Sequence, residues 1–353
     1  MWKIIKIASA FIGIIVGAGF ASGKEVLQYF VSFGYWGLAG VVLSTALFAY
    51  VGMMLVKIGS RLQTVSHREA IFKISGKFFG TIIDYVLIFT LFGISVAMVA
   101  GAGTVLNQQF GIPTFVGALI MIALIVLTAL FNVGRFVAIL GSVTPFLILA
   151  MIIIAGYSII TFDGSITALE PIASGTPTTL PNWYISALNY VSFNVAVGAS
   201  MSLVMGGDEK DERTAAIGGL VGGLGIGFLI LLGYVAVFSK IDYIAAYDMP
   251  LLEIITEISP FLGIFMTLVL FGMIFNTGAS MFYAFIARFF FMGTKKGVIA
   301  TFVVGTIVFL LSFLGFTGVV AKFYPLIGYL GLFLMGVLFY APFKLKKIPK
   351  ITE

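Results

Sequence analysis

The residues best suited to bind a solute lie near the start of the chain, where glycines interrupt an apolar run. Residues 11–25 read Phe-Ile-Gly-Ile-Ile-Val-Gly-Ala-Gly-Phe-Ala-Ser-Gly-Lys-Glu. Each glycine costs a helix about 1 kcal/mol relative to alanine, so this spacing predicts a break between Gly17 and Gly23. A break at membrane depth frees backbone amides for a carboxylate and carbonyls for a cation. Close packing of helices through small residues is the alternative explanation.

A second run of small and polar residues lies in the middle of a later apolar segment. From Tyr190 to Ser202 it reads Tyr-Val-Ser-Phe-Asn-Val-Ala-Val-Gly-Ala-Ser-Met-Ser. Paired interruptions in corresponding helices are the best sequence indication of a transporter binding site. The pattern therefore predicts that the first and sixth membrane helices are both broken.

Two acidic residues fall within apolar segments, where ionisable side chains are functional candidates. Glu25 follows the first break and is a candidate coupling residue that relays protons. An ion pair between Lys24 and Glu25 in a water-filled vestibule is the alternative, and it is slightly favoured. Asp84 lies near the end of its segment, and we expect it to be an interfacial anchor.

The composition indicates a membrane protein and argues against an enzyme. The chain is 61% hydrophobic and 10% charged, against about 45–50% and about 25% in soluble domains. It has no cysteine and one histidine, so neither thiolate nor histidine-rich metal sites can form. We find no convergent catalytic set of the kind that a membrane enzyme needs, neither an HExxH nor a GxSxG element. The net charge of +6 is spread over short pieces between apolar runs, which argues against a nucleic-acid partner.

The apolar segments predict an all-α integral membrane protein with ten transmembrane helices. A bilayer core of about 30 Å needs roughly 20 apolar residues per helix. Windows of this kind occupy residues 5–32, 36–57, 82–106, 113–132, 136–160, 184–206, 214–238, 260–290, 297–315 and 318–341.

The basic residues predict the orientation of these helices, because cytoplasmic connections collect lysine and arginine. With the N-terminus inside, 17 of the 20 basic residues fall on the cytoplasmic side, Lys240 and Lys322 fall outside, and Lys24 lies within the first span. Both termini are therefore expected in the cytoplasm. In one outer connection, residues 242–260, the apolar spacing predicts a short amphipathic helix that lies on the outer face as a lid.

The first and sixth spans are five helices apart, so equivalent positions run in opposite directions through the membrane. We therefore expect a 5+5 inverted repeat. The predicted parts are a first five-helix repeat, an outer connection, a second five-helix repeat and a cytoplasmic basic tail, at residues 1–160, 161–183, 184–343 and 344–353.

The glycine-rich run from Val16 to Phe20 resembles the first-helix signature of the amino acid, polyamine and organocation (APC) transporter superfamily. Ten helices with broken helices 1 and 6 match its LeuT-type architecture. Over essentially its whole length, the chain is similar to the YkvI family of bacterial membrane proteins. The resemblance implies a multi-pass protein of the bacterial cytoplasmic membrane that transports a small solute by alternating access, an amino acid or related amine.

The resemblance also implies two sets of site residues. The first binds substrate, and the amides after Ala18 and Gly19 receive its carboxylate: Gly17, Ala18, Gly19, Phe20, Ala21, Ser22, Ser192, Phe193 and Asn194. The second forms a sodium-type site, from the carbonyls of Gly13 and Val16 with Asn276, Thr277 and Ser280. No cofactor other than Na⁺ is implied, and the partners are a small-molecule substrate and membrane lipid.

Departures from the family pattern keep alternatives open. Ala18 stands where many amino acid permeases have serine, and the eighth span lacks an adjacent pair of hydroxyl residues. Na⁺ coupling is narrowly favoured over H⁺ coupling. A ligand-sensing receptor subunit on the same scaffold, like the germinant receptors of spores, is the main alternative function, and a passive channel is disfavoured. The sequence leaves the oligomeric state open.

Overall fold

The structure, a computed structural model, describes residues 1–64, 67–131 and 144–345. Within these ranges every regular element is a helix. In chain order they are α1 (Trp2–Ile15), α2 (Ala18–Ser22), α3 (Lys24–Tyr29), the 3-10 helix η1 (Val31–Phe33), α4 (Tyr35–Leu62), α5 (His67–Phe110), α6 (Thr114–Phe131), α8 (Thr144–Ile160), α9 (Ile166–Ser174), α10 (Trp183–Gly207), α11 (Glu212–Ser239), α12 (Ile241–Ile244), α13 (Pro250–Ile258), α14 (Pro260–Ala287), α15 (Lys295–Ser312) and α16 (Phe316–Leu345).

The apolar windows of the sequence coincide with these helices. In the described part of the chain, seven helices are long and apolar enough to cross a membrane, and α6 and α8 are shorter apolar helices. The fold is therefore that of a multi-pass all-α membrane protein. The third predicted span, 82–106, lies inside the longer α5, which bends at Gly76. The start of the fifth span, 136–143, and most of the basic tail, 346–353, lie outside the described residues.

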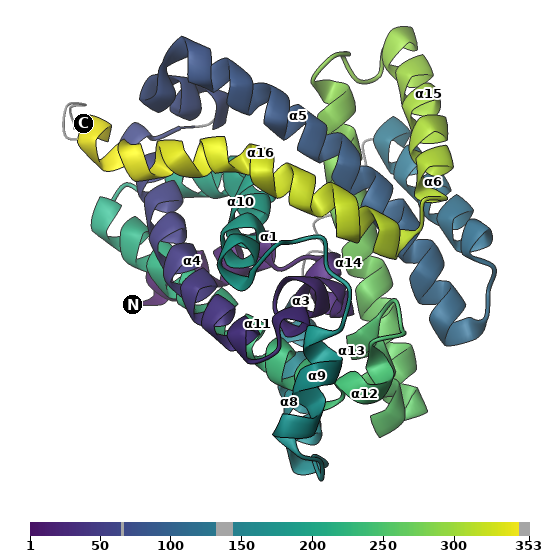
Figure 1. Cartoon of the computed structure of the whole chain (residues 1–353). Helices are drawn as coiled ribbons and strands as arrows, with labels where there is room; N and C mark the ends of the chain where they lie inside the picture. Colours follow the sequence, from purple (N-terminus) through teal and green to yellow (C-terminus); the bar gives the residue numbers. More distant parts are fainter. Residues whose placement is uncertain (65–66, 132–143, 346–353) are drawn as a thin grey trace.

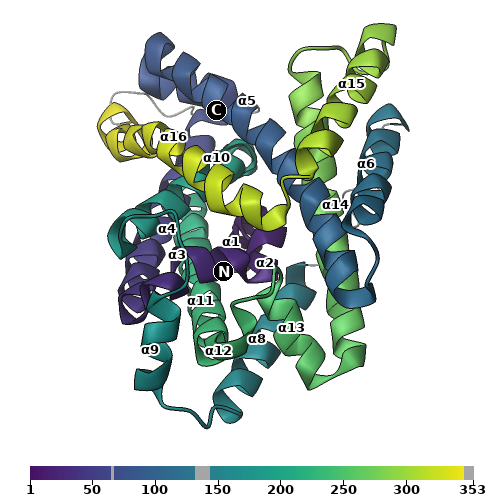
Figure 2. The ribbon, with the colours of Figure 1, turned by 45° about the vertical axis from the view of Figure 1, so that its right-hand side comes forward.

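The helices divide into two groups. In Figure 1, α4 and α11 lie on the left, α6 and α15 lie on the right, and α5 runs from the upper left across to the right. One group contains α1, α4, α10 and α11, which pack on one another, and the other contains α5, α6, α14 and α15. α16 contacts both α10 and α5. In the turned view, α1 and α2 lie near the centre, between the two groups (Figure 2).

Glycines allow the helices of the first group to approach closely. A Cβ added to Gly52 of α4 would collide with the backbone of Gly219 on α11, and one added to Gly206 of α10 would collide with Val56 of α4. Small residues at such contacts bring helix backbones together and increase dispersion contacts where no water is available to drive association. These glycines therefore make α4, α10 and α11 a compact unit.

The first apolar segment is interrupted where the glycines predict it. α1 ends at Ile15, Val16 and Gly17 have extended backbones, and α2 begins at Ala18. A second interruption follows at Gly23, whose φ of 84° is in the left-handed region that favours glycine. The side chain of Leu251 on α13 occupies the space where a Cβ of Gly23 would stand, so this position needs glycine for a close approach as well.

The predicted break in the sixth span is wrong, because α10 is continuous from Trp183 to Gly207. Its polar side chains bond within the helix instead of opening it: Asn194 Nδ2 donates to Tyr190 O at 3.0 Å and Ser202 Oγ to Gly198 O at 2.8 Å. The small residues serve packing, since a Cβ on Gly198 would collide with Ile15 at the end of α1.

The two ends of the helical bundle differ in character. At one end, α9, α12 and α13 gather in both views (Figures 1 and 2), and we call this the α13 end. α14 begins beside α13 and runs to Ala287, which places Arg288 at the other end, the Arg288 end. There Lys3 pairs with Glu209 at 3.2 Å, Arg61 with Glu212 at 2.7 Å, and Arg288 with Asp84.

Candidate functional site

The break between α1 and α2 lies inside the protein. Val16, Ala18, Gly19, Phe20, Ala21 and Ser22 are all buried, and Gly17 is half-buried. Apart from its chain neighbours, no atom lies within 4 Å of the position that a Cβ of Gly17 would take. The extended backbone is thus buried at Val16 and half-buried at Gly17, with open space beside Gly17. Non-helical backbone is tolerated at membrane depth where protein buries it or where it lines a cavity.

Glu25 belongs to α3, and its side chain points back toward α2. Its carboxylate Oε1 fills the space where a Cβ of Gly19 would stand, and Tyr190 Oη donates to its Oε2 at 3.1 Å. The side chain is 5% exposed. The predicted ion pair with Lys24 does not form, because Lys24 Nζ donates to Tyr247 O at 3.1 Å instead.

Aromatic rings surround this carboxylate. Phe193 of α10 stacks on Tyr324 of α16 with 4.3 Å between ring centroids, and the ring of Tyr324 also borders Gly19. Tyr190 contacts Tyr29 at 5.0 Å, and Tyr29 Oη lies 3.4 Å from Asn189 Oδ1. We call Gly17, Gly19 and Glu25 with Tyr190, Phe193 and Tyr324 the central site.

The structure distributes the other predicted substrate residues differently. Phe193 faces Tyr324 within the central site, but Ser192 Oγ donates to Gly328 O of α16 at 2.7 Å and so joins two helices. Asn194 is buried and bonds within its own helix. Ser22 Oγ donates to Gly19 O at 2.6 Å. Ser192, Asn194 and Ser22 are therefore engaged in packing or local structure.

The residues of the predicted sodium site come from α1 and α14. Val16 is buried, whereas Gly13 is exposed on α1. Asn276, Thr277 and Ser280 are half-buried on α14, a helix that contacts α2, and α1 packs chiefly against α11. The sodium site stays a prediction. Of its two predicted carbonyl ligands, the residue Val16 is buried and the residue Gly13 is exposed.

At the α13 end, α13 packs against α2 and Gly23, and we call α13 with the residues that hold it there the seal. The predicted amphipathic helix in residues 242–260 is confirmed as α13, and Leu251, Leu252, Ile254 and Ile255 are buried there. Gln108 of α5 clamps its start: Gln108 Nε2 donates to Met249 O at 3.1 Å, and Met249 N donates to Gln108 Oε1 at 3.0 Å. At the edge of this seal, Thr317 of α16 is hydrogen-bonded to Asp248.

A cavity of about 260 Å³ opens between α5, α10 and α14 toward the Arg288 end. Its lining includes Ala196 and Val197, about one helical turn beyond Phe193, together with Ser280 and the paired Asp84 and Arg288. The predicted interfacial anchor Asp84 is thus part of an ion pair at the mouth of this cavity. The central site thus has α13 on the side of the α13 end and this cavity on the side of the Arg288 end.

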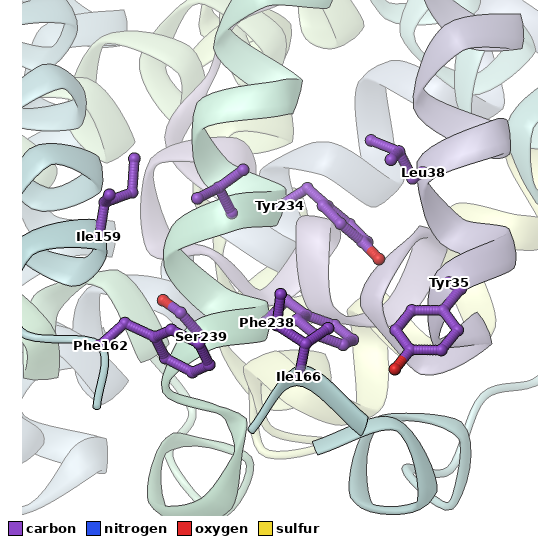
Figure 3. Close-up of a pocket in the computed structure, with 9 residues that line it drawn as sticks. Tyr35, Leu38, Ile159, Phe162, Ile166, Tyr234, Phe238 and Ser239 are labelled. Carbon is purple, nitrogen blue, oxygen red and sulfur yellow. The ribbon is translucent and has the colours of Figure 1, made fainter. Parts of the chain in front are cut away.

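Another pocket, of about 320 Å³, is apolar and lies away from the central site. Its side chains come from α4, α8, α9 and α11 near the α13 end, and Tyr35, Tyr234 and Phe238 are among them (Figure 3). It has no charged lining residue, so it offers nothing that would orient a polar solute.

Sequence reasoning missed two members of the central site. Tyr190 was only part of the polar run in the sixth span. Tyr324 lies between Phe323 and Pro325 in the last span, where no run of small or polar residues singles it out. A buried tyrosine hydroxyl requires a partner, and only the fold shows that the partner of Tyr190 is Glu25.

No protein-family model matches the chain. Over most of its length it is similar to the membrane protein YkvI of Bacillus subtilis (strain 168), with 26% identity over 334 residues that cover 94% of each chain.

Among solved structures, the chain is similar to MhsT in complex with L-phenylalanine (TM-score 0.62, 17% identity, 98% of this chain and 97% of that one). It is also similar to the inward-facing conformation of Mhp1, a nucleobase-cation-symport-1 family transporter (TM-score 0.59, 15% identity, 94% and 75%). The chain therefore has the LeuT-like fold of membrane transporters. The likeness is to transporters and not to enzymes, in agreement with the sequence.

Proposed function

We propose that this protein is a secondary active transporter that moves a small solute across the bacterial cytoplasmic membrane by alternating access. The observation that carries the proposal is the buried break at Val16 and Gly17, which adjoins a site of charged and aromatic side chains. Broken helices at mid-membrane supply unpaired backbone groups for solute and ion. The LeuT-like fold supports the same function.

The site is covered at one end of the molecule and not at the other, which supports an alternating mechanism. α13 seals one end, and the cavity beside Asp84 and Arg288 approaches the site from the other. In the orientation that the basic residues favour, with both termini in the cytoplasm, the sealed end is extracellular and the cavity is cytoplasmic. The described arrangement is then the cytoplasm-facing state of the cycle.

The solute that we propose is an amino acid or a related amine, and Na⁺ is the favoured coupling ion. MhsT holds L-phenylalanine in a protein of similar fold. The ten-helix inverted repeat, with parts at 1–160 and 184–343, is the arrangement that would let the group of α1, α4, α10 and α11 rock against the rest. A sensing role on the same scaffold is the second candidate, and it predicts binding without transport.

A thermal-shift screen of the detergent-purified protein tests the binding half of this proposal. A ligand at 100 times its Kd stabilises a folded state by about 2.7 kcal/mol, so a true solute raises the melting temperature by several degrees. We expect one class among amino acids, amines and nucleobases to do so, and the shift to increase with Na⁺ but not with K⁺. The absence of a shift for every solute in both salts would contradict the transporter assignment.

A further inference from the structure

Glu25 is a buried carboxylate without a cationic partner among the described residues. The ion pairs of the described chain join other residues, and the hydrogen bond to Glu25 comes from the neutral hydroxyl of Tyr190. A charged group inside a membrane protein is costly unless it is paired, so a buried carboxylate without a cationic neighbour either takes up a proton or binds a cation that enters the site.

The neighbouring cation is held elsewhere. Lys24 precedes Glu25, but its Nζ donates to the carbonyl of Tyr247 at the α13 end. The left-handed turn at Gly23 starts α3, and successive residues of a helix point in different directions. Lys24 therefore belongs to the seal, and Glu25 belongs to the central site.

The position of the Glu25 carboxylate decides which solutes the central site favours. Its Oε1 lies against Gly19 of α2, two residues after the open space beside Gly17. Two carboxylates at this spot would repel each other in surroundings of low dielectric constant. The chain thus already places a carboxyl group of its own at this spot, which disfavours a solute that would bring a second one.

The groups around this carboxylate suit an organic cation. The Tyr190 hydroxyl contacts it, the Tyr324 ring borders Gly19 next to it, and Phe193 stacks on Tyr324. The faces of such rings attract ammonium groups. A metal cation would need several oxygen ligands, whereas the groups that the structure places next to the Glu25 carboxylate are Gly19 and the hydroxyl of Tyr190, with the Tyr324 ring beside Gly19. The open space beside Gly17 lies on the same segment.

We propose that Glu25 is the counter-ion for the ammonium group of the solute, and that the solute is a cationic amine without a carboxylate. This inference rests on the proposed function and makes it more specific. The ammonium group lies between the Glu25 carboxylate and the aromatic rings, and the remainder of the solute extends toward Gly17. Binding of the cation places a positive charge next to this carboxylate.

Matched solutes test this inference. The probes are L-phenylalanine and L-valine, their decarboxylated forms 2-phenylethylamine and isobutylamine, and their deaminated forms 3-phenylpropionate and isovalerate, with longer alkylamines and diamines added. Binding to the full chain is measured by thermal shift and by calorimetry. Glu25→Gln removes the charge at constant shape, Glu25→Asp keeps the charge, and Glu69→Gln removes an exposed carboxylate from α5 as the control.

The inference predicts that the native chain binds only amines without a carboxylate. Glu25→Gln should weaken that binding about 100-fold, as expected when one partner of a buried charge pair is removed. Glu25→Asp should keep the preference for amines at lower affinity, and Glu69→Gln should bind like the native chain. Glu25→Asp also guards against a failure of Glu25→Gln to fold, because it preserves the charge on the same helix.

Three results would overturn the inference, and they differ in whether they also contradict the proposed function. Tight binding of L-phenylalanine or a carboxylate, unchanged or improved in Glu25→Gln, rejects the amine class but leaves transport standing. Amine binding that Glu25→Gln retains, with loss of uptake driven by a pH gradient, makes Glu25 a proton carrier instead. Binding of no probe by the native chain rejects the proposed function together with the inference.

Discussion

At the scale of single residues, Gly19 is the position where size matters most. A leucine there would need the space that the Glu25 carboxylate and the Tyr324 ring occupy. We expect Gly19→Leu to weaken solute binding more than about 100-fold while the fold persists, because forcing a bulky side chain into a packed site costs about 1–3 kcal/mol and displaces the binding groups.

Gly336→Leu is the matched control, since Gly336 lies exposed on α16 with open space where a side chain would go. Both variants are compared by gel filtration, which reports the fold, and by the thermal shift with solute. Normal binding by a well-folded Gly19→Leu protein would show that the solute does not bind at the central site.

Local sequence identified some of these residues and could not identify others. The glycines and Glu25 stand out because they interrupt an apolar run, a property visible within a few positions. The partner of Glu25 could not be found in this way, because Tyr190 lies 165 residues further along the chain. Adjacency in sequence favoured Lys24 as the partner, but the turn at Gly23 directs it to Tyr247.

At the scale of elements, α13 is the helix whose role can be tested most directly. The side chain of Gln108 makes two hydrogen bonds to the backbone of Met249. At about 1 kcal/mol for each bond, Gln108→Ala should favour the undocked state by up to about 30-fold. Asn107→Ala is the control, because Asn107 bonds Ile112 O and not α13.

The absence of native cysteines makes this effect measurable. A single cysteine at Ala18 lies on α2, which contacts α13. In whole cells, an impermeant maleimide should label Ala18→Cys faster when combined with Gln108→Ala, and at the native rate with Asn107→Ala. Equal labelling in all three proteins would mean that α13 does not control access to the break.

The first span is interrupted as predicted whereas the sixth is continuous, and both predictions were based on the same small residues. Small residues permit a break and permit close helix contact equally well. In the first span, Gly17 has open space beside it and the chain opens. In α10, Gly198 lies against Ile15 and Gly206 lies against Val56. Glycine there allows close packing of α10 on its neighbours, and the helix stays continuous.

At the scale of the whole molecule, the two helix groups give the chain a division along which it can move. Glycine contacts tie α4, α10 and α11 together, and α5 is the centre of the other group. The central site lies where α2, α10 and α16 meet, close to both groups. This division depends on contacts between distant segments, so hydropathy could predict apolar spans but not how they group.

The most direct test of the account is exchange across a membrane. The full chain is reconstituted into liposomes loaded with the solute that gives the largest thermal shift, and uptake of the labelled solute from outside is followed, with Gly19→Leu and Gly336→Leu measured in parallel. We predict saturable uptake that internal solute accelerates, that Gly336→Leu retains and that Gly19→Leu loses. Binding of the solute without any exchange would contradict transport and identify a sensor.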